Sequence, residues 1–195
     1  MKTTFLSESA RHFTVASALI LMAGCAPTRK TPTPATPHPS PTSQCPAKYP
    51  QHYADATQGY SICLPANAHK TSAAGLPAGS VLFTGFSVPA GTNLTRKDLS
   101  VQPGMDDNLQ NATPFGQFTA GGVTFQRMKE GDAGAGHRQE HIIYLWAHAG
   151  KKLYFDFGLY SVNPQIVGPP MPTEFNEPAQ VKITEEIMKT FRPLH

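Results

Sequence analysis

Alternating apolar and polar positions predict that residues 45–195 form a domain built mostly of β-strands. Between Lys152 and Leu159 every second residue is Leu or Phe, the period-2 pattern of a strand with one buried face. Glu140 to His148 is apolar at odd and even positions alike, so we expect it near the centre of the sheet. Turn residues bound further strands. These are expected at Tyr60–Leu64, Val81–Val88, Asp98–Gln102, Gln117–Thr119 and Val123–Lys129, the last two as a hairpin turning at Gly121-Gly122.

The end of the chain has the pattern of a helix. Asn176 is a capping residue and Pro178 suits a first helical turn. Ile183, Ile187 and Phe191 then repeat at i, i+4 and i+8, which places one apolar stripe along the helix. The predicted fold class is therefore α+β, an antiparallel sheet with a C-terminal helix packed on one face.

Residues 1–24 are typical of an export signal. Lys2 and Arg11 lie in a charged start, and an uncharged run from Phe13 to Ala23 follows. This run is about half of the roughly 20 apolar residues that a membrane-spanning helix needs. We expect the segment to be removed on export.

The signal ends in Leu21-Met22-Ala23-Gly24-Cys25, which resembles a bacterial lipobox, although Met22 stands where Leu is usual. The resemblance implies that Cys25 receives a diacylglyceryl group, that cleavage follows Gly24 and that the new amino terminus is acylated. The lipid bilayer is then a partner through Cys25. Ala26, in place of Asp, implies sorting to the outer membrane of a Gram-negative host, with the domain facing the periplasm. The alternative is an ordinary secretory signal with an incidental cysteine.

Residues 25–44 are rich in Pro, Thr and Ser and contain nothing that can form a core. Closely spaced prolines favour an extended polyproline II chain of about 3.1 Å per residue, or roughly 60 Å for the whole segment. We interpret it as a tether between the anchor and a single domain at 45–195. A docking or cell-wall-engaging motif with Arg29 and Lys30 is the alternative.

With Cys25 as the lipid site, Cys45 and Cys63 remain in an oxidising compartment, where a disulfide is the simplest use of an isolated pair. Alternation within 60–64 places Cys63 opposite the apolar face of the strand. The disulfide is thus expected to attach the end of the tether to the non-core face. A redox or metal role is the alternative, but there is no Cys-x-x-Cys spacing.

The chain has 195 residues and 16 basic against 13 acidic residues, a formal net charge of +3. Four of the basic residues and one acidic residue precede Cys45, so the domain itself is close to neutral. A nucleic-acid surface needs a clustered basic excess. We therefore expect no nucleic-acid partner.

Several short segments of residues 50–192 resemble the PsbP-like superfold, which includes the photosystem II protein PsbP, the Mog proteins, DcrB and several bacterial lipoproteins. They are the opening strand Gly59–Pro65, Gly122-Val123-Thr124-Phe125 within a hairpin, the long hairpin after it, and the ending Ile187–Arg192. The resemblance implies the same α+β fold. It carries over no functional residue, because this superfold has unrelated binding roles.

The sharpest chemical motif is His137-Arg138-Gln139-Glu140-His141, which matches the H-x-x-E-H string of some metalloproteases. That chemistry needs both histidines on one turn of a helix. The flanking residues predict a strand, in which the same spacing covers about 13 Å, too far for one zinc ion. We therefore expect these residues to be polar positions at the start of a strand.

Other motifs are weaker. The glycine-rich stretch 131–136 lacks the order of a phosphate-binding loop and is interpreted as a hairpin connection. Asp106, Asp107 and Asp132 offer calcium-type oxygens without the EF-hand ligand series. No G-x-S-x-G nucleophile is present, His52 and His69 are isolated, and we predict no metal or cofactor.

Aromatic residues on the central hairpin are the remaining candidate for a binding surface. Tyr144, Trp146, His148 and Tyr154 would form a strip for a peptide or glycan if they lay on its outer face. Burial in the core is the commoner fate of such residues.

These patterns predict a lipid-anchored, non-catalytic binding or assembly module whose partner is an envelope protein or peptidoglycan. A small envelope hydrolase is the alternative, either metal-dependent through His137, Glu140 and His141 or built in a concave pocket where a His meets a carboxylate or a hydroxyl group from a different strand. A structural lipoprotein that engages the cell wall through its tether is the third.

Overall fold

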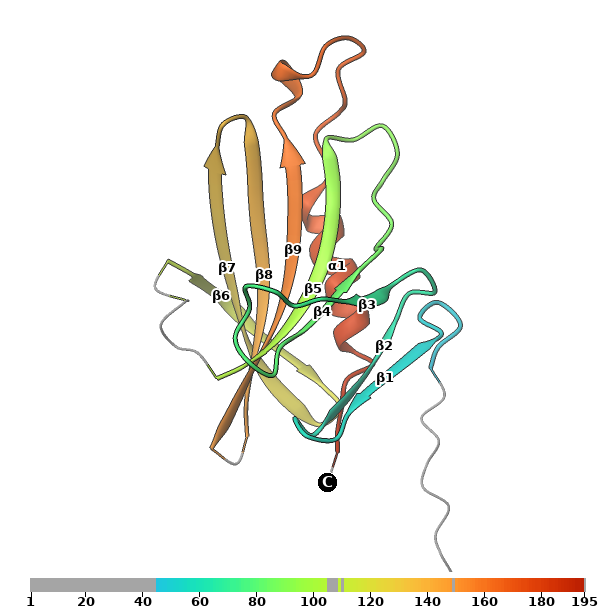
Figure 1. Cartoon of the computed structure of the whole chain (residues 1–195), viewed down its shortest axis with the longest axis vertical. Coiled ribbons are helices and arrows are strands. Elements are labelled where there is room, and N and C mark those ends of the chain that lie inside the picture. The colour runs from blue at the N-terminus through green and yellow to red at the C-terminus, as the bar shows by residue number, and fades with distance from the viewer. Residues whose placement is uncertain (1–44, 105–108, 110, 149, 195) are drawn as a thin grey trace, which may run out of the picture. The chain divides into compact units, whose positions relative to one another are not determined.

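The computed structural model describes residues 45–104, 109, 111–148 and 150–194. These residues form two antiparallel sheets and a helix near the C-terminus, which confirms the α+β class (Figure 1). The segments 1–24 and 25–44, including Cys25, lie outside the described residues, as do Asp106 and Asp107. No helix of the described part is long and apolar enough to cross a membrane.

A seven-stranded sheet is the main layer, with the order β3-β4-β5-β9-β8-β7-β6. Its strands are β3 His69–Thr71, β4 Val81–Thr84, β5 Leu94–Pro103, β6 Thr113–Ala120, β7 Val123–Gly134, β8 His137–His148 and β9 Lys151–Val162. Both β8 and β9 pair with a neighbour on each side, as their buried side chains require. Strand β9 is the middle strand of the seven and β8 lies beside it, so the prediction that residues 140–148 lie near the centre is correct to within one strand.

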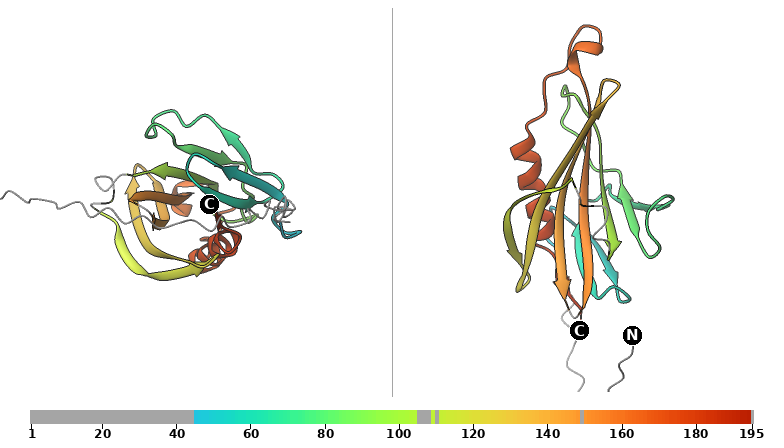
Figure 2. Two further views of the ribbon diagram at one scale, coloured as in Figure 1. Left: turned by 90° about the horizontal axis from the view of Figure 1, so that it is seen from below. Right: turned by 90° about the vertical axis from the view of Figure 1, so that its left-hand side faces the viewer.

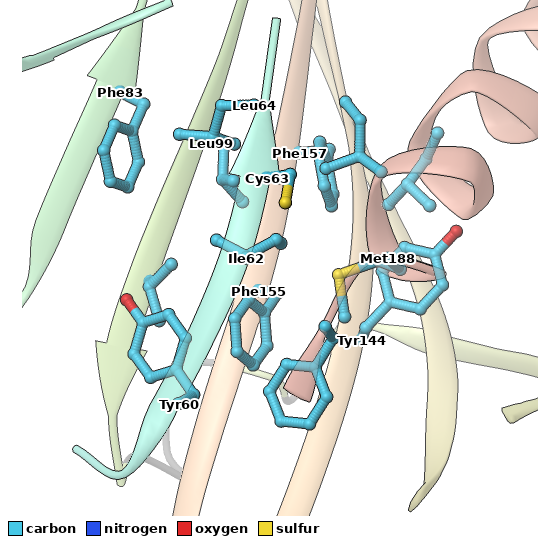
Figure 3. Packing of buried hydrophobic residues seen from close by; sticks show 14 of the residues in the cluster. Tyr60, Ile62, Cys63, Leu64, Phe83, Leu99, Tyr144, Phe155, Phe157 and Met188 are labelled. Atoms are coloured by element: carbon cyan, nitrogen blue, oxygen red, sulfur yellow. The ribbon is translucent and has the colours of Figure 1, made fainter. Parts of the chain in front are cut away.

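A three-stranded sheet joins both ends of the domain. Its order is β1-β2-β10, with β1 at Gln51–Asp55, β2 at Tyr60–Leu64 and β10 at Arg192–Pro193. Every residue of β2 is buried, because β2 is the middle strand and packs on the large sheet. Tyr60, Ile62 and Leu64 point toward Leu99 and Phe155 (Figure 3).

Helix α1, Glu177–Met188, lies along one face of the large sheet (Figure 2), after a short 3₁₀ turn η2 at Pro164–Ile166. Its start agrees with the prediction: the side chain of Asn176 accepts a hydrogen bond from the N–H of Ala179, 3.0 Å away. Its end does not, because Phe191 lies beyond the helix. The helix still packs by its core face, and the Tyr144 hydroxyl lies 2.7 Å from that of Thr184.

Phe191 is fully buried just after the helix, between the large sheet and Tyr60 of the small sheet, whose ring stacks on it with the centroids 6.4 Å apart. Its ring centroid lies 5.0 Å from those of Phe125 and Trp146, and 5.5 Å from that of Phe155. The backbone N–H groups of Thr190 and Phe191 donate to the carbonyls of Ile187 and Met188, each at 3.0 Å, and the Thr190 hydroxyl also donates to the carbonyl of Ile187, at 2.6 Å. A local turn, and not another turn of helix, thus delivers the aromatic residue to the core.

Cys45 and Cys63 form a disulfide with their Cα atoms 5.7 Å apart. The predicted position of Cys63 on a non-core face is wrong, since the residue is only 2% exposed. Its N–H donates to the hydroxyl of Thr190 at 2.8 Å, so the segment after α1 covers this side of β2. Both faces of the strand are enclosed, and the disulfide attaches the start of the domain to its core.

Candidate functional site

A cleft of about 950 Å³ opens where strands β7, β8 and β9 meet the first turn of α1. This volume lies within the range of small-molecule binding sites. Glu140 and Ser161 belong to its sheet side, Phe175 and Glu177 to its helix side, and Gly136 and Pro164 to its outer edge. The side chains converge from four segments that are far apart in the sequence, so this cleft is the main candidate site.

Asn93 fixes the wall of the cleft beside the helix. This residue is 6% exposed, and its side-chain amide donates to the carbonyl of Val162 at 2.8 Å. Its side-chain oxygen accepts a hydrogen bond from the N–H of Phe175 at 2.9 Å, and its own N–H donates to the carbonyl of Thr173. One buried amide therefore connects β9 with the segment that precedes α1, and the cleft is largely pre-formed.

The opposite edge is a tight hairpin turn between β7 and β8. Ala135 and Gly136 both have positive φ angles, 47° and 79°, which two-residue hairpins of this type require. A Cβ atom at Gly136 would lie 2.3 Å from the Cδ1 atom of Ile166, so η2 packs directly on the turn. The glycine-rich segment predicted to be a connection thus continues β7 to Gly134 before it turns.

Glu140 is the most unusual residue of the cleft, because its carboxylate is buried and only 2% exposed. Arg138 forms an ion pair with its Oε1 atom from the solvent side, whereas no described residue donates a hydrogen bond to Oε2. Burial raises the pKa of Glu140, and the charge of Glu177 raises it further, while Arg138 and Lys129 act in the opposite direction. Lys129 in turn forms an ion pair with Glu177.

A second hollow, of about 360 Å³, lies on the other face of the large sheet. Here His141 of β8 meets Asp156 of β9, with its Nδ1 atom 2.9 Å from one carboxylate oxygen and 3.1 Å from the other. The hydrogen bond with Asp156 raises the pKa of His141; burial lowers it, and the charges of Asp156, Glu130 and Asp98 raise it. This histidine and carboxylate come from different strands, an arrangement that sequence does not reveal.

Gly158 allows further polar groups to gather beside this pair. A Cβ atom at this position would lie 2.5 Å from Oδ1 of Asp98 and 3.0 Å from the hydroxyl of Tyr160. The guanidinium of Arg96 stacks 3.7 Å from the centre of the Tyr160 ring, and its Nε lies 3.5 Å from Asp98. Burial raises the pKa of Asp98, against the effect of Arg96. The outer face therefore carries a packed, mainly acidic network around one histidine.

We expect Asp156→Asn to lower the pKa of His141, which NMR titration of its ring signals would measure. Because the folded-state pKa is raised, the pair stabilises the fold fully below the unfolded value of about 6.5, and this contribution is lost as pH rises through the folded value. The substitution should therefore cost about 1–2 kcal/mol at pH ~5.5, and less at high pH. An equal cost at both pH values would show that the charged pair contributes nothing.

The structure separates the other residues singled out from the sequence. His137, Glu140 and His141 all lie on β8, where side chains alternate, so Glu140 points away from the face of the two histidines. Within the described ranges, no three His, Cys, Asp or Glu residues could hold a metal ion. The prediction that residues 137–141 lie in a strand and not in a helix is confirmed.

The four residues Tyr144, Trp146, His148 and Tyr154, which the sequence suggested as a binding strip, do not lie on one surface. Tyr144 is fully buried under α1, and Tyr154 lies on the opposite face of the sheet, beside the hollow of His141. Trp146 and His148 remain together, with parallel rings whose centroids are 5.5 Å apart. They line a small pocket of about 140 Å³.

No protein-family model matches the chain, and no curated protein matches it. A solved structure from Bacteroides thetaiotaomicron VPI-5482 is similar over 70% of this chain, with 11% sequence identity and a TM-score of 0.41. The match spans only 45% of that chain.

Proposed function

We propose that the chain is an exported lipoprotein, acylated on Cys25 and anchored in the outer membrane, whose domain binds a ligand or partner in the envelope without catalysing a reaction. The anchor rests on the lipobox-like residues 21–25, and the spacer on the Pro-rich residues that follow. The Cys45–Cys63 disulfide supports an oxidising compartment.

The cleft carries the binding role. It is large, it has a wall fixed by Asn93, and it contains the buried carboxylate of Glu140. Concave sites with a few converging polar groups are the usual places of ligand binding. We also propose the PsbP-like superfold as the finer class of the α+β domain, on the sequence segments that resemble it.

The anchor makes a direct prediction for Cys25→Ser. The wild-type protein should enter the detergent phase, because several acyl chains contribute about 0.8 kcal/mol per buried methylene. The variant should stay in the aqueous phase, and mass spectrometry should show the mass of the acyl groups only on the wild type. A variant that still enters the detergent phase would contradict the proposed anchor.

Crosslinking in living cells tests the binding role. A photoreactive residue at His137, which lines the cleft, should give a defined crosslinked product. The same residue at Val88, an exposed position outside the cleft-lining set, is the matched control. Equal products from both positions, or none from His137, would argue against a binding role of the cleft.

The hydrolase alternative is favoured by one observation, the His141–Asp156 pair in its hollow. A His oriented by a carboxylate can act as a general base. Within the described part of the chain, no serine, threonine or cysteine hydrogen bonds to this histidine. A hydrolytic activity lost in His141→Ala but kept in Glu140→Gln would favour this alternative.

The cell-wall alternative depends on the Pro/Thr tether, which lies outside the described residues. Replacing residues 26–44 by a Gly-Ser segment of equal length should leave retention on peptidoglycan unchanged if the domain carries the function. Loss of retention would favour a structural role of the tether.

A further inference from the structure

We propose that the cleft binds a primary ammonium group, which donates hydrogen bonds to the carboxylate of Glu140 in place of the Arg138 guanidinium. The inference rests on the proposed binding function and adds the chemical class of the ligand. Two kinds of ligand carry such an alkylammonium group: a free amine and the lysine side chain of a protein.

The first argument is the unused acceptor capacity of Glu140. An ionised carboxylate has about four lone-pair sites for donors. The side chain of Glu140 is 2% exposed; Arg138 engages only its Oε1 atom, as an ion pair, and no described residue donates a hydrogen bond to Oε2. Burying a carboxylate oxygen that accepts no hydrogen bond is costly, so a donor that enters the cleft and reaches Oε2 would gain a strong, charge-assisted interaction.

The second argument is the position of Arg138. Its side chain is 56% exposed, whereas its partner Glu140 is buried. The two residues are separated by one position on β8 and lie on the same face, so the guanidinium reaches back from the open side. Arg138 therefore occupies the place where a cationic ligand would approach, and it can swing into solvent when one arrives.

The third argument is the charge of the cleft. Glu140, Glu174 and Glu177 line it, against Arg138 in the lining and Lys129 behind it, which forms an ion pair with Glu177, so among these described residues one carboxylate is in excess. This balance attracts cations and repels anions. The first turn of α1 would otherwise attract an anion, but the side chain of Asn176 caps it and Glu177 already places a carboxylate there.

An ammonium group fits these observations better than a metal ion. Among the described residues, no group of three metal-ligating side chains exists in the cleft or elsewhere. An ammonium has three donors and a compact charge, and its alkyl stem needs only apolar contact such as that of Phe175 and Pro178.

Cadaverine is a suitable probe, with pentanediol as its uncharged counterpart. Amide NMR spectra at pH ~8 should show saturable shifts of cleft residues with millimolar cadaverine and none with the diol. Glu140→Gln should weaken cadaverine binding at least about tenfold, because a charge-assisted hydrogen bond is lost. The matched control is Glu174→Gln, which removes an exposed carboxylate at the rim and should change the affinity by about twofold or less.

Arg138→Gln provides a test of opposite sign. Removing the internal competitor should tighten cadaverine binding several-fold, an effect that mere damage to the fold would not produce. If Glu140→Gln fails to fold, this variant decides the question: unchanged or weaker binding would overturn the proposal.

Two further outcomes separate the proposal from the function on which it rests. Binding of the diol as strongly as cadaverine would overturn the ammonium class but leave the cleft as a binding site. Absence of any shift with millimolar cadaverine would also overturn the ammonium class, and the crosslinking from His137 would then decide the binding role alone.

A doubly blocked Gly-Lys-Gly tripeptide that binds more tightly than cadaverine would identify the source as a protein lysine, and weaker binding would identify a free amine.

Discussion

Phe191→Ala is expected to lower the free energy of unfolding by about 3–5 kcal/mol, because a fully buried aromatic ring leaves a cavity that neighbours fill only partly. The ring lies against Phe125, Trp146 and Phe155 of the large sheet and stacks on Tyr60 of the small sheet, so the loss would be felt in both sheets. Chemical denaturation followed by the fluorescence of Trp146 would measure it.

Phe86→Ala is the matched control for this prediction. Phe86 is only partly buried and packs at the margin of the same core. Its removal should cost about 1–2 kcal/mol, since less apolar surface is lost from the interior. Equal costs for the two variants would show that the segment after the helix is not a central part of the core.

Removing the disulfide by replacing Cys45 and Cys63 with alanine should lower the free energy of unfolding by about 3 kcal/mol. The bond joins residues 18 positions apart, and the chain-entropy model gives about 3 kcal/mol for a loop of similar length. Denaturation of the oxidised wild type and of the double variant measures the difference.

A reducing agent supplies the control for the disulfide. Reduced wild-type protein should unfold at nearly the same denaturant concentration as the double variant, and the variant itself should not respond to the reductant. A variant as stable as the oxidised wild type would contradict the stabilising role of the bond.

The strongly patterned elements were predictable from sequence because their burial is simple. Residues 152–159 alternate strictly, and Asn176 and Pro178 mark the start of α1. The sequence pattern does not predict strands β1 and β3, since β1 lacks an apolar face and all three residues of β3 are exposed. Hydrogen bonding to a neighbouring strand defines them, and that information is not local.

The candidate site was less predictable than the fold. In the sequence Glu140 stands out only as part of a metalloprotease-like string, whereas the structure places it among the even-numbered, buried positions of β8. Its environment depends on Glu177, Lys129 and the loop held by Asn93, which are distant in the sequence. Asp156 was visible as a polar position of its strand, but only the register of β8 and β9 brings it to His141.

The small sheet places chain from the two ends of the domain on either side of β2. Strand β1 pairs along one edge soon after Cys45, and β10 pairs along the other edge only at Arg192 and Pro193. A chain that stopped before Phe191 would thus lack both the last strand and a central ring of the core. A copy clipped before this point would keep an open, apolar edge on β2 and become more susceptible to proteolysis.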